Sequence, residues 1–238
     1  MSADAPPAEA HEHAHADVSG GRLRAAVFGA MDGLVTNTAL VAGVGGGGAP
    51  PRTIVLAGVA SLVAGAISMA LGEYTSVRTQ NEQLDLEVEK ERRELQRNPG
   101  GELAELVQVM RARGVDEDLA QRVAVQLHRD PDTALRLHVV AEIGLDPADK
   151  PSPWTAGTSS FVTFAVGAAV PLLPYLLGLS LLWVALLCGG LGLAVAGALS
   201  SRATPRPWWY AAARQLLFGA VAAGATYAVG LAIGVTVA

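Results

Sequence analysis

Four glutamates in the middle of the chain have the residue type and the spacing that metal binding needs. Glu91 and Glu94 are three residues apart, and Glu102 and Glu105 repeat that spacing after a break at 98–101. Residues three apart share a helix face, so each pair can point two carboxylates at one ion. Oxygen ligands of this kind suit Fe²⁺ and Mn²⁺. The stretch therefore offers two acidic pairs joined by a turn.

The same glutamates are compatible with an ordinary solvated helix that binds no metal. They alternate with the basic residues Lys90, Arg92, Arg93 and Arg97. Mixed charges of this kind usually form ion pairs along a helix surface. The spacing alone leaves both interpretations open.

Histidines occur at two places where they could add a nitrogen ligand. His138 and Glu142 lie four residues apart on one helix face, so together they can supply a third arm of an acidic site. A lone histidine is more often a surface or core residue. The amino-terminal tail carries His11, His13 and His15, and His-rich tracts can hold metal weakly. A solvated tail with no ordered role is the simpler interpretation there.

One carboxylate lies inside an apolar stretch near the amino terminus. Asp32 is the only charged residue between 25 and 44. An intramembrane carboxylate costs roughly 2.5 to 3.5 kcal/mol on insertion scales, so it should face a partner, a cavity or an ion path. The alternative is an aspartate near the membrane surface that caps or bonds a neighbouring helix. If Asp32 lies on an ion path, a proton and a cation would compete for it, which is a minimal antiport mechanism.

Two further residues could line the same path. Met69 lies near the inner end of the second apolar stretch, and Glu73 follows one helical turn later. A methionine in an apolar helix usually faces lipid or fills a core. Only a partner such as Asp32 would make its thioether a metal ligand.

The elements that must hold these residues are membrane helices. The chain has 238 residues, of which 51% are hydrophobic, 5% aromatic and 16% charged, a profile typical of membrane proteins. Residues 54–72 carry no charge, and 19 residues of helix cover roughly 28 Å, close to the ~30 Å apolar core of a bilayer. The pattern predicts an all-α membrane protein with five transmembrane helices, at 25–44, 54–72, 156–177, 179–199 and 209–235.

A charged insert separates the second and third spans. From Glu73 to Arg97 neither glycine nor proline interrupts the helical pattern, so one helix should leave the membrane and continue in water. Three further helices are expected at 101–113, 116–129 and 132–143. The predicted domains are a disordered tail at 1–21, two spans at 22–72, a three-helix metal-binding insert at 73–150 and three spans at 151–238.

The distribution of charge predicts the orientation. With the amino terminus inside, only Arg52 of the 17 basic residues lies outside, as the positive-inside rule requires. The insert should then be cytosolic in a multi-pass protein of the plasma membrane. All 22 acidic residues lie at or before Asp149, and no basic patch with interleaved aromatics suggests nucleic-acid binding. Cys188 is the single cysteine, so no intrachain disulfide can form.

Over residues 22–238 the sequence resembles the vacuolar iron transporter family. The resemblance rests on residues 32–36 (DGLVT), 64–69 (AGAISM), 72–74 (GEY) and 91–95 (ERREL), followed by Glu102 and Glu105. It implies a homodimer of five-span protomers that exchanges cytosolic Fe²⁺ or Mn²⁺ for protons. It also implies a cytosolic insert that collects metal through glutamates, and an Asp and a Met in the first two spans that line the path.

The residue roles that the resemblance implies fall on particular positions of this chain. The metal-collecting glutamates would be Glu91, Glu94, Glu102, Glu105 and Glu142. The path residues would be Asp32 and Met69, with Glu73 at the inner mouth. Where the family has two methionines, four and three residues before the last glutamate, this chain has His138 and Val139. An imidazole in place of sulfur changes the expected metal preference, and Zn²⁺ or Co²⁺ become possible binders.

The function expected from the sequence is export of cytosolic Fe²⁺ or Mn²⁺ by proton antiport, without enzymatic activity. The partners expected are metal ions, protons, the lipid bilayer and a second copy that packs through the first two spans. A ferritin-like metal protein is one alternative, but residues 73–150 lack the paired Glu-x-x-His motifs of such bundles. A membrane-anchored metal sensor is another, and Asp32 inside a span argues against mere anchoring.

Overall fold

Every regular element in the described part of the chain is a helix. The structure is a computed structural model that describes residues 21–203 and 206–237, so His11, His13 and His15 of the expected tail lie outside the described residues. The elements are α1 (Gly21–Gly46), α2 (Pro51–Arg97), α3 (Pro99–Ala112), α4 (Glu117–Leu127), α5 (Pro131–Ile143), α6 (Pro153–Ala169), a 3₁₀ turn η1 (Val170–Leu172), α7 (Leu173–Leu176), α8 (Leu182–Ser200), a 3₁₀ turn η2 (Ser201–Ala203) and α9 (Trp208–Val237).

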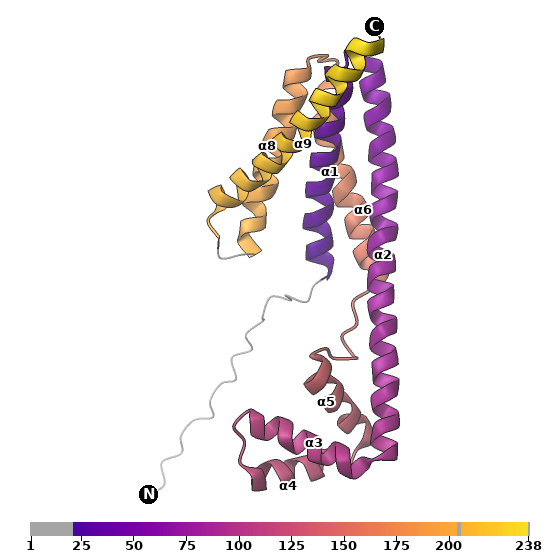
Figure 1. Cartoon of the computed structure of the whole chain (residues 1–238), viewed down its shortest axis with the longest axis vertical. Coiled ribbons are helices and arrows are strands. Elements are labelled where there is room, and N and C mark those ends of the chain that lie inside the picture. The colour runs from indigo at the N-terminus through magenta and orange to yellow at the C-terminus, as the bar shows by residue number, and fades with distance from the viewer. Residues whose placement is uncertain (1–20, 204–205, 238) are drawn as a thin grey trace, which may run out of the picture.

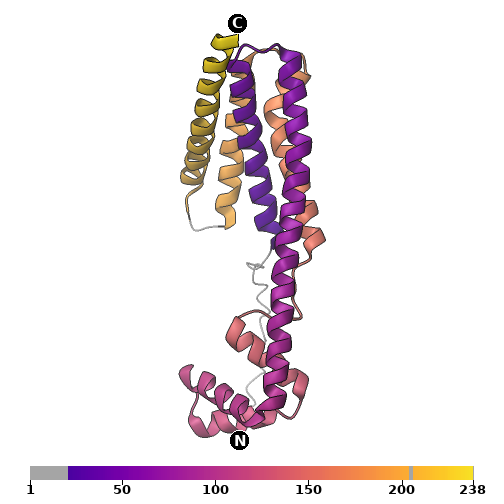
Figure 2. The ribbon, with the colours of Figure 1, turned by 45° about the vertical axis from the view of Figure 1, so that its right-hand side comes forward.

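Five segments are long and apolar enough to cross a membrane, as the sequence predicts. They lie in α1, in α2, in the segment from α6 to α7, in α8 and in α9. Figures 1 and 2 show them as one bundle, with the insert at the end opposite to the carboxyl terminus. Pro171 and Pro174 mark where the third span changes from α6 through η1 to the short α7. The predicted all-α architecture with five spans is confirmed.

The helix α2 belongs to both the membrane bundle and the insert. It runs for 47 residues, or roughly 70 Å at ~1.5 Å per residue, and begins with Pro51, whose missing N–H leaves no bond unmade at a helix start. It ends at Asn98, whose backbone leaves helical geometry (φ −140°, ψ 60°) although its N–H still donates to the Glu94 carbonyl. The Asn98 side chain then accepts from the Gly101 N–H and so caps α3. One residue therefore turns the chain from α2 into α3.

The helix α1 lies at the centre of the bundle, where it contacts α2, α6, α8 and α9. Asn37 is fully buried, and its Nδ2 donates to the carbonyls of Gly58 (3.1 Å) and Ala168 (2.8 Å). This side chain thereby ties α1 to α2 and α6. Because backbone carbonyls in a membrane have few other donors, a bond of this kind fixes how the three helices sit together.

Small residues let α1 approach its neighbours closely. A Cβ added at Gly33 would collide with the Phe164 carbonyl oxygen of α6, and one added at Gly167 would collide with the Ala30 carbonyl oxygen of α1. Close backbone approach through small residues is the usual way in which membrane helices pack. The α1–α6 contact therefore depends on glycine at these positions.

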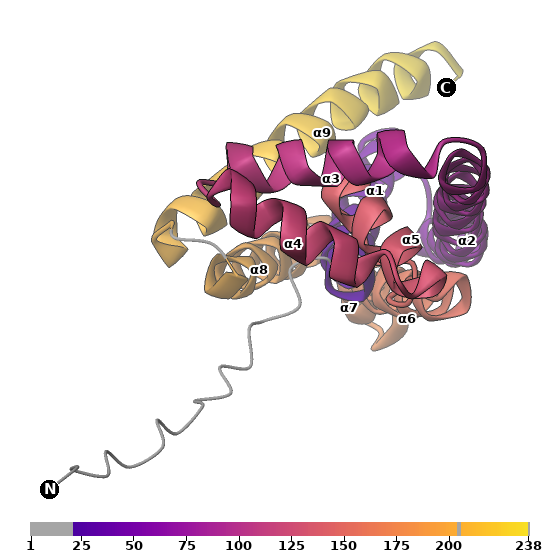
Figure 3. The same cartoon turned by 90° about the horizontal axis from the view of Figure 1, so that it is seen from below.

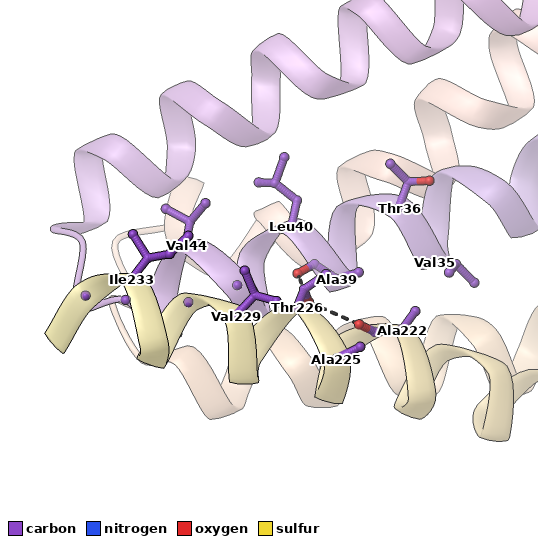
Figure 4. A pocket seen from close by; sticks show the side chains of 14 residues that line it. Val35, Thr36, Ala39, Leu40, Val44, Ala222, Ala225, Thr226, Val229 and Ile233 are labelled. Atoms are coloured by element: carbon purple, nitrogen blue, oxygen red, sulfur yellow. Dashed lines mark hydrogen bonds between the residues drawn. The ribbon is translucent and has the colours of Figure 1, made fainter. Parts of the chain in front are cut away.

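At its other end α1 packs against α9 along an apolar groove. Figure 4 shows Thr226 of α9 beside Ala39 of α1, where the Thr226 Oγ1 donates to the Ala39 carbonyl at 2.5 Å. The groove is lined by residues of α1 from 35 to 44, by Gly47 just after α1, and by residues of α9 from 222 to 234. Its glycines, including Gly230, bring the two backbones together.

The insert is built on the far half of α2. Leu106 and Val107 of α3 bury against Ala120 and Ala124 of α4, which makes these helices a hairpin. Figure 3, seen from below, shows α3 and α4 side by side under the bundle. A second small core joins α2 to α5 through Leu84, Leu135 and Val139. The three helices expected beyond α2 are therefore present: α3 and α4 pack against each other, and α5 packs against α2.

Candidate metal centre

Four side chains from three helices of the insert converge on one point. Glu91 comes from α2, Glu102 from α3, and His138 and Glu142 from α5. Each offers one ligand atom, and these four atoms lie within 4.8 Å of one another. Three carboxylates and one imidazole at such distances can hold a single divalent cation.

His138 lies at the middle of this group. Its side chain is 2% exposed, and its Nδ1 lies 3.3 Å from Glu91 Oε1, 3.6 Å from Glu102 Oε2 and 3.7 Å from Glu142 Oε1. The helical spacing of His138 and Glu142 on α5 accounts for the last of these contacts. The other two require α2 and α3 to pack against α5. The imidazole thus shares one nitrogen among three carboxyl groups.

The site is closed on the α2 side and open on the α5 side. The side chains of Glu91 and Glu102 are 6% and 11% exposed, whereas that of Glu142 is 39% exposed. Glu91 Oε1 is buried and has no hydrogen-bond partner among the described residues, although His138 Nδ1 lies 3.3 Å from it. An unpartnered buried carboxylate oxygen is costly unless a cation neutralises it. Glu142 is the side from which an ion can enter.

Burial and mutual repulsion shift the pKa values of all four groups. Burial, and then the charges of Glu142 and Glu102, raise the pKa of Glu91 from 4.5 to about 7. Burial and the charge of Glu105 raise the pKa of Glu102 and of Glu142. Burial lowers the pKa of His138, which favours the neutral imidazole. Near neutral pH the site therefore holds protons that a metal ion would have to displace.

Glu94 and Glu105 do not join the four-residue group. Both side chains are exposed. They act on the group through their charges, since Glu94 contributes to the raised pKa of Glu91, and Glu105 to those of Glu102 and Glu142. Six residues of the insert were expected to form the site. The structure brings four of them together, whereas Glu94 and Glu105 are exposed and lie outside the group.

His128 belongs to the site and was not found from the sequence. It caps the end of α4, and its Nε2 lies 3.4 Å from the Nε2 of His138. The two rings are perpendicular, with centroids 5.3 Å apart. His128 Nδ1 lies 3.0 Å from the Ala124 carbonyl oxygen. Because ten residues and a helix break separate the two histidines, no helix-face rule connects them.

The three expected path residues lie along α1 and the membrane half of α2. Asp32 is half-buried, and its Oδ1 accepts from Thr36 Oγ1 of the same helix at 3.3 Å. Met69 is half-buried and packs against Ala66 and Phe164. Among the described residues, this hydrogen bond of Asp32 is therefore one within its own helix.

Glu73 has a partner that the sequence did not indicate. Its side chain is 12% exposed, and its Oε2 lies 3.2 Å from Nη2 of Arg24. This ion pair joins the first turns of α1 to α2 near the end of the apolar bundle. A cation that approached Glu73 would compete with the Arg24 guanidinium.

The sequence was compared with known proteins. Residues 23–231 match the family model described as "VIT family". A protein of Acanthamoeba castellanii named "Vacuolar iron transporter" is 39% identical over 168 residues, which is 71% of this chain and 60% of that protein. "Vacuolar iron transporter 1" of Oryza sativa subsp. japonica is 29% identical over 236 residues, or 96% of this chain and 94% of the rice protein. "Vacuolar iron transporter 1" of Eucalyptus grandis is 32% identical over 169 residues, or 70% and 66%. The match thus spans less than two thirds of the amoeba protein and nearly all of the rice protein.

Proposed function

Since the chain belongs to the VIT family, we propose that it transports divalent iron across a membrane, with manganese as a second substrate. The observation that carries this proposal is the buried group of Glu91, Glu102, His138 and Glu142 at the foot of a helix that also crosses the membrane. The relatives are named as transporters. Membership in their family makes this chain a transporter and not an enzyme.

The donor set of the site supports a divalent transition metal as the cargo. Three carboxylates and one imidazole suit Fe²⁺ and Mn²⁺, and they would also bind Zn²⁺ or Co²⁺. In the order of increasing affinity for such ligands, zinc stands above iron and manganese. We therefore propose that the supply of metal and the geometry of the path, and not raw affinity, select the cargo.

We propose that ions pass from the insert to Glu73 and then along Met69 and Asp32. The Glu73 carboxylate forms an ion pair with Arg24. An arriving cation would therefore have to replace the Arg24 guanidinium at the inner mouth. At Asp32 a cation and a proton would compete for one carboxylate, which couples metal export to proton entry. In this proposal the insert faces the cytosol, and the protein lies in the plasma membrane.

The functional unit that we propose is a homodimer. The membrane half of α2 exposes apolar side chains on one face, namely Leu56, Val59, Val63, Ile67 and Leu71. A second copy packed there would place α1 and α2 of both protomers at the centre. We expect Val63→Cys to form a disulfide between copies, whereas Val162→Cys on α6 should not. Cross-linking at 162 alone would place the interface elsewhere.

The transport experiment uses proteoliposomes loaded with metal under an imposed pH gradient. We expect Asp32→Asn to abolish flux, because asparagine keeps the size and hydrogen bonding of the residue but cannot exchange a proton for a cation. Metal binding at the insert, measured by calorimetry on the full chain in detergent, should stay as in the parent. Asp116→Asn, an exposed position in the insert, serves as the control and should leave flux unchanged.

Two results would contradict the proposal. Flux that persists in Asp32→Asn vesicles and still follows the pH gradient would remove Asp32 from the mechanism. If the unmutated protein binds metal but vesicles that contain it show no flux, the protein is better described as a membrane-anchored metal sensor.

A further inference from the structure

We propose that His128 is a positioning residue that fixes which nitrogen of His138 binds the metal. This inference rests on the proposed function, in which His138 is a metal ligand. It assigns Nδ1 of His138 as the ligand atom and Nε2 as a hydrogen-bond donor to His128. The chain of contacts runs from the Ala124 carbonyl through His128 to His138.

The first contact fixes the tautomer of His128. Its Nδ1 lies 3.0 Å from the Ala124 carbonyl oxygen, and a carbonyl oxygen can only accept. His128 Nδ1 must therefore carry the hydrogen and donate it. In the neutral ring the other nitrogen, Nε2, then has a lone pair and no hydrogen.

The second contact passes this constraint to His138. The two Nε2 atoms lie 3.4 Å apart, and the rings are perpendicular, so one nitrogen can point its hydrogen at the lone pair of the other. Since His128 Nε2 is the acceptor, His138 Nε2 is the donor. The lone pair of His138 is thereby left on Nδ1.

The lone pair on Nδ1 faces the carboxylates. That nitrogen lies within 3.7 Å of an oxygen of each of Glu91, Glu102 and Glu142. A lone pair facing three carboxyl groups is poorly placed unless a proton or a cation lies between them, and Glu91 Oε1 has no hydrogen-bond partner. One cation bound to His138 Nδ1 and to one oxygen of each of the three glutamates would satisfy all four atoms. Ligating histidines commonly donate their second N–H to an oriented acceptor, and loss of that acceptor weakens metal binding.

The surroundings of His128 allow this bond to be removed without a large change in packing. His128 lies at a shallow pocket whose lining includes Leu95, Leu103 and Leu135. A leucine at position 128 would meet apolar neighbours there, but it could not accept a hydrogen bond. A glutamine could still accept one through its side-chain oxygen.

The test follows the histidine nitrogens directly in the full chain. The sequence has five histidines, so His11→Ala, His13→Ala and His15→Ala leave signals from His128 and His138 only. With ¹⁵N-labelled histidine in lipid, NMR should show His138 with its hydrogen on Nε2. Titration with Zn²⁺, which is diamagnetic, should shift the Nδ1 signal of His138 and leave Nε2 of both rings unligated.

Variants at position 128 separate positioning from packing. We expect His128→Leu to lower zinc affinity by roughly 10- to 100-fold in calorimetry and to move hydrogen onto Nδ1 of His138. His128→Gln should keep most of the affinity and the parent tautomer. Gln126→Leu, an exposed position on the same helix, should match the parent in both measurements.

Each contrary result has a distinct meaning. The inference is overturned if the hydrogen of His138 is on Nδ1 in the parent, if zinc ligates Nε2 of either ring, or if His128→Leu binds zinc as the parent does. The NMR of the parent decides the question even if a variant fails to fold. A parent protein that binds no zinc at its glutamates would instead overturn the proposed function itself.

Discussion

At the scale of single residues, the metal centre is an unstable arrangement that a cation would relieve. Glu91 and Glu102 are buried with Glu142 close by, and burial raises the pKa of each. In the metal-free protein, folding is then favoured by protons on these groups. A group whose pKa is raised in the folded state binds more protons folded than unfolded, so stability falls as pH rises from about 4.5 through about 7 for Glu91.

The same shift predicts how metal binding depends on pH. Below about pH 7 a metal ion must displace a proton from Glu91, whereas above it the carboxylate is already free. We expect affinity for Mn²⁺ to rise between pH 6 and pH 8, by up to about tenfold per pH unit for each proton displaced. Calorimetry on the full chain at several pH values measures this slope.

The matched variant for this measurement is Glu91→Gln, which cannot titrate. It should bind metal more weakly and show a flatter dependence on pH. Glu89→Gln changes an exposed glutamate of the same helix and should reproduce the parent curve. A parent affinity that is constant from pH 6 to pH 8 would mean that the proton on Glu91 is not displaced.

The sequence gives part of the metal centre and misses part of it. Regular spacing identifies pairs on one helix, and the pair His138 and Glu142 is indeed adjacent on α5. Spacing cannot tell which member of a pair points inward. In the structure Glu91 lies in the group and Glu94 is exposed, and the sequence could not distinguish the two. His128 reaches His138 across the break between α4 and α5, a tertiary contact that no local pattern encodes.

At the scale of helices, the contact between α1 and α6 should tolerate no side chain at Gly33. A Cβ there would meet the Phe164 carbonyl oxygen, which belongs to the backbone and cannot rotate away. We expect Gly33→Ala to destabilise the bundle by about 1–3 kcal/mol, because the helices must separate to make room. The thermal unfolding midpoint in detergent measures the effect.

The control for this variant is Gly72→Ala in α2. A Cβ at Gly72 would meet nothing within 4 Å. Alanine in a helix interior is more favourable than glycine by roughly 0.5–1 kcal/mol, so this change should leave the midpoint equal or higher. If both variants lower the midpoint alike, loss of glycine and not steric overlap is the cause.

Helix boundaries were largely predictable from composition, and helix contacts were not. The absence of glycine and proline between Glu73 and Arg97 correctly predicts that α2 leaves the bundle unbroken. The ion pair of Arg24 with Glu73 joins residues 49 positions apart. It depends on the register of α1 against α2, which Asn37 and the glycines set through tertiary contacts.

At the scale of the whole molecule, the orientation can be tested with a single engineered cysteine. In a Cys188→Ser background, we expect Glu117→Cys, on the exposed start of α4, to react with an impermeant maleimide only after the cells are permeabilised. Arg52→Cys, at the other end of the bundle, should react in intact cells. The reverse pattern would invert the membrane orientation and the proposed direction of transport.

The continuous course of α2 also sets a distance, and this distance bears on how tightly the insert should hold its ion. Glu73 and Glu91 lie 18 residues apart on one helix, which corresponds to roughly 27 Å. In the proposed path, an ion released at Glu91 would begin its diffusion within that radius of Glu73, which for one ion is a local concentration on the order of tens of millimolar.

A high local concentration helps transport only if release is frequent. With association near a diffusion limit of about 10⁹ M⁻¹s⁻¹, a nanomolar site would release roughly one ion per second, and a micromolar site roughly a thousand. In the proposed path the helix fixes only how far from the entrance a released ion starts, so a site that releases ions more often starts more ions at that distance. At a fixed association rate, weaker affinity means a shorter residence time at the insert, and this residence time then limits how fast the proposed path can be supplied.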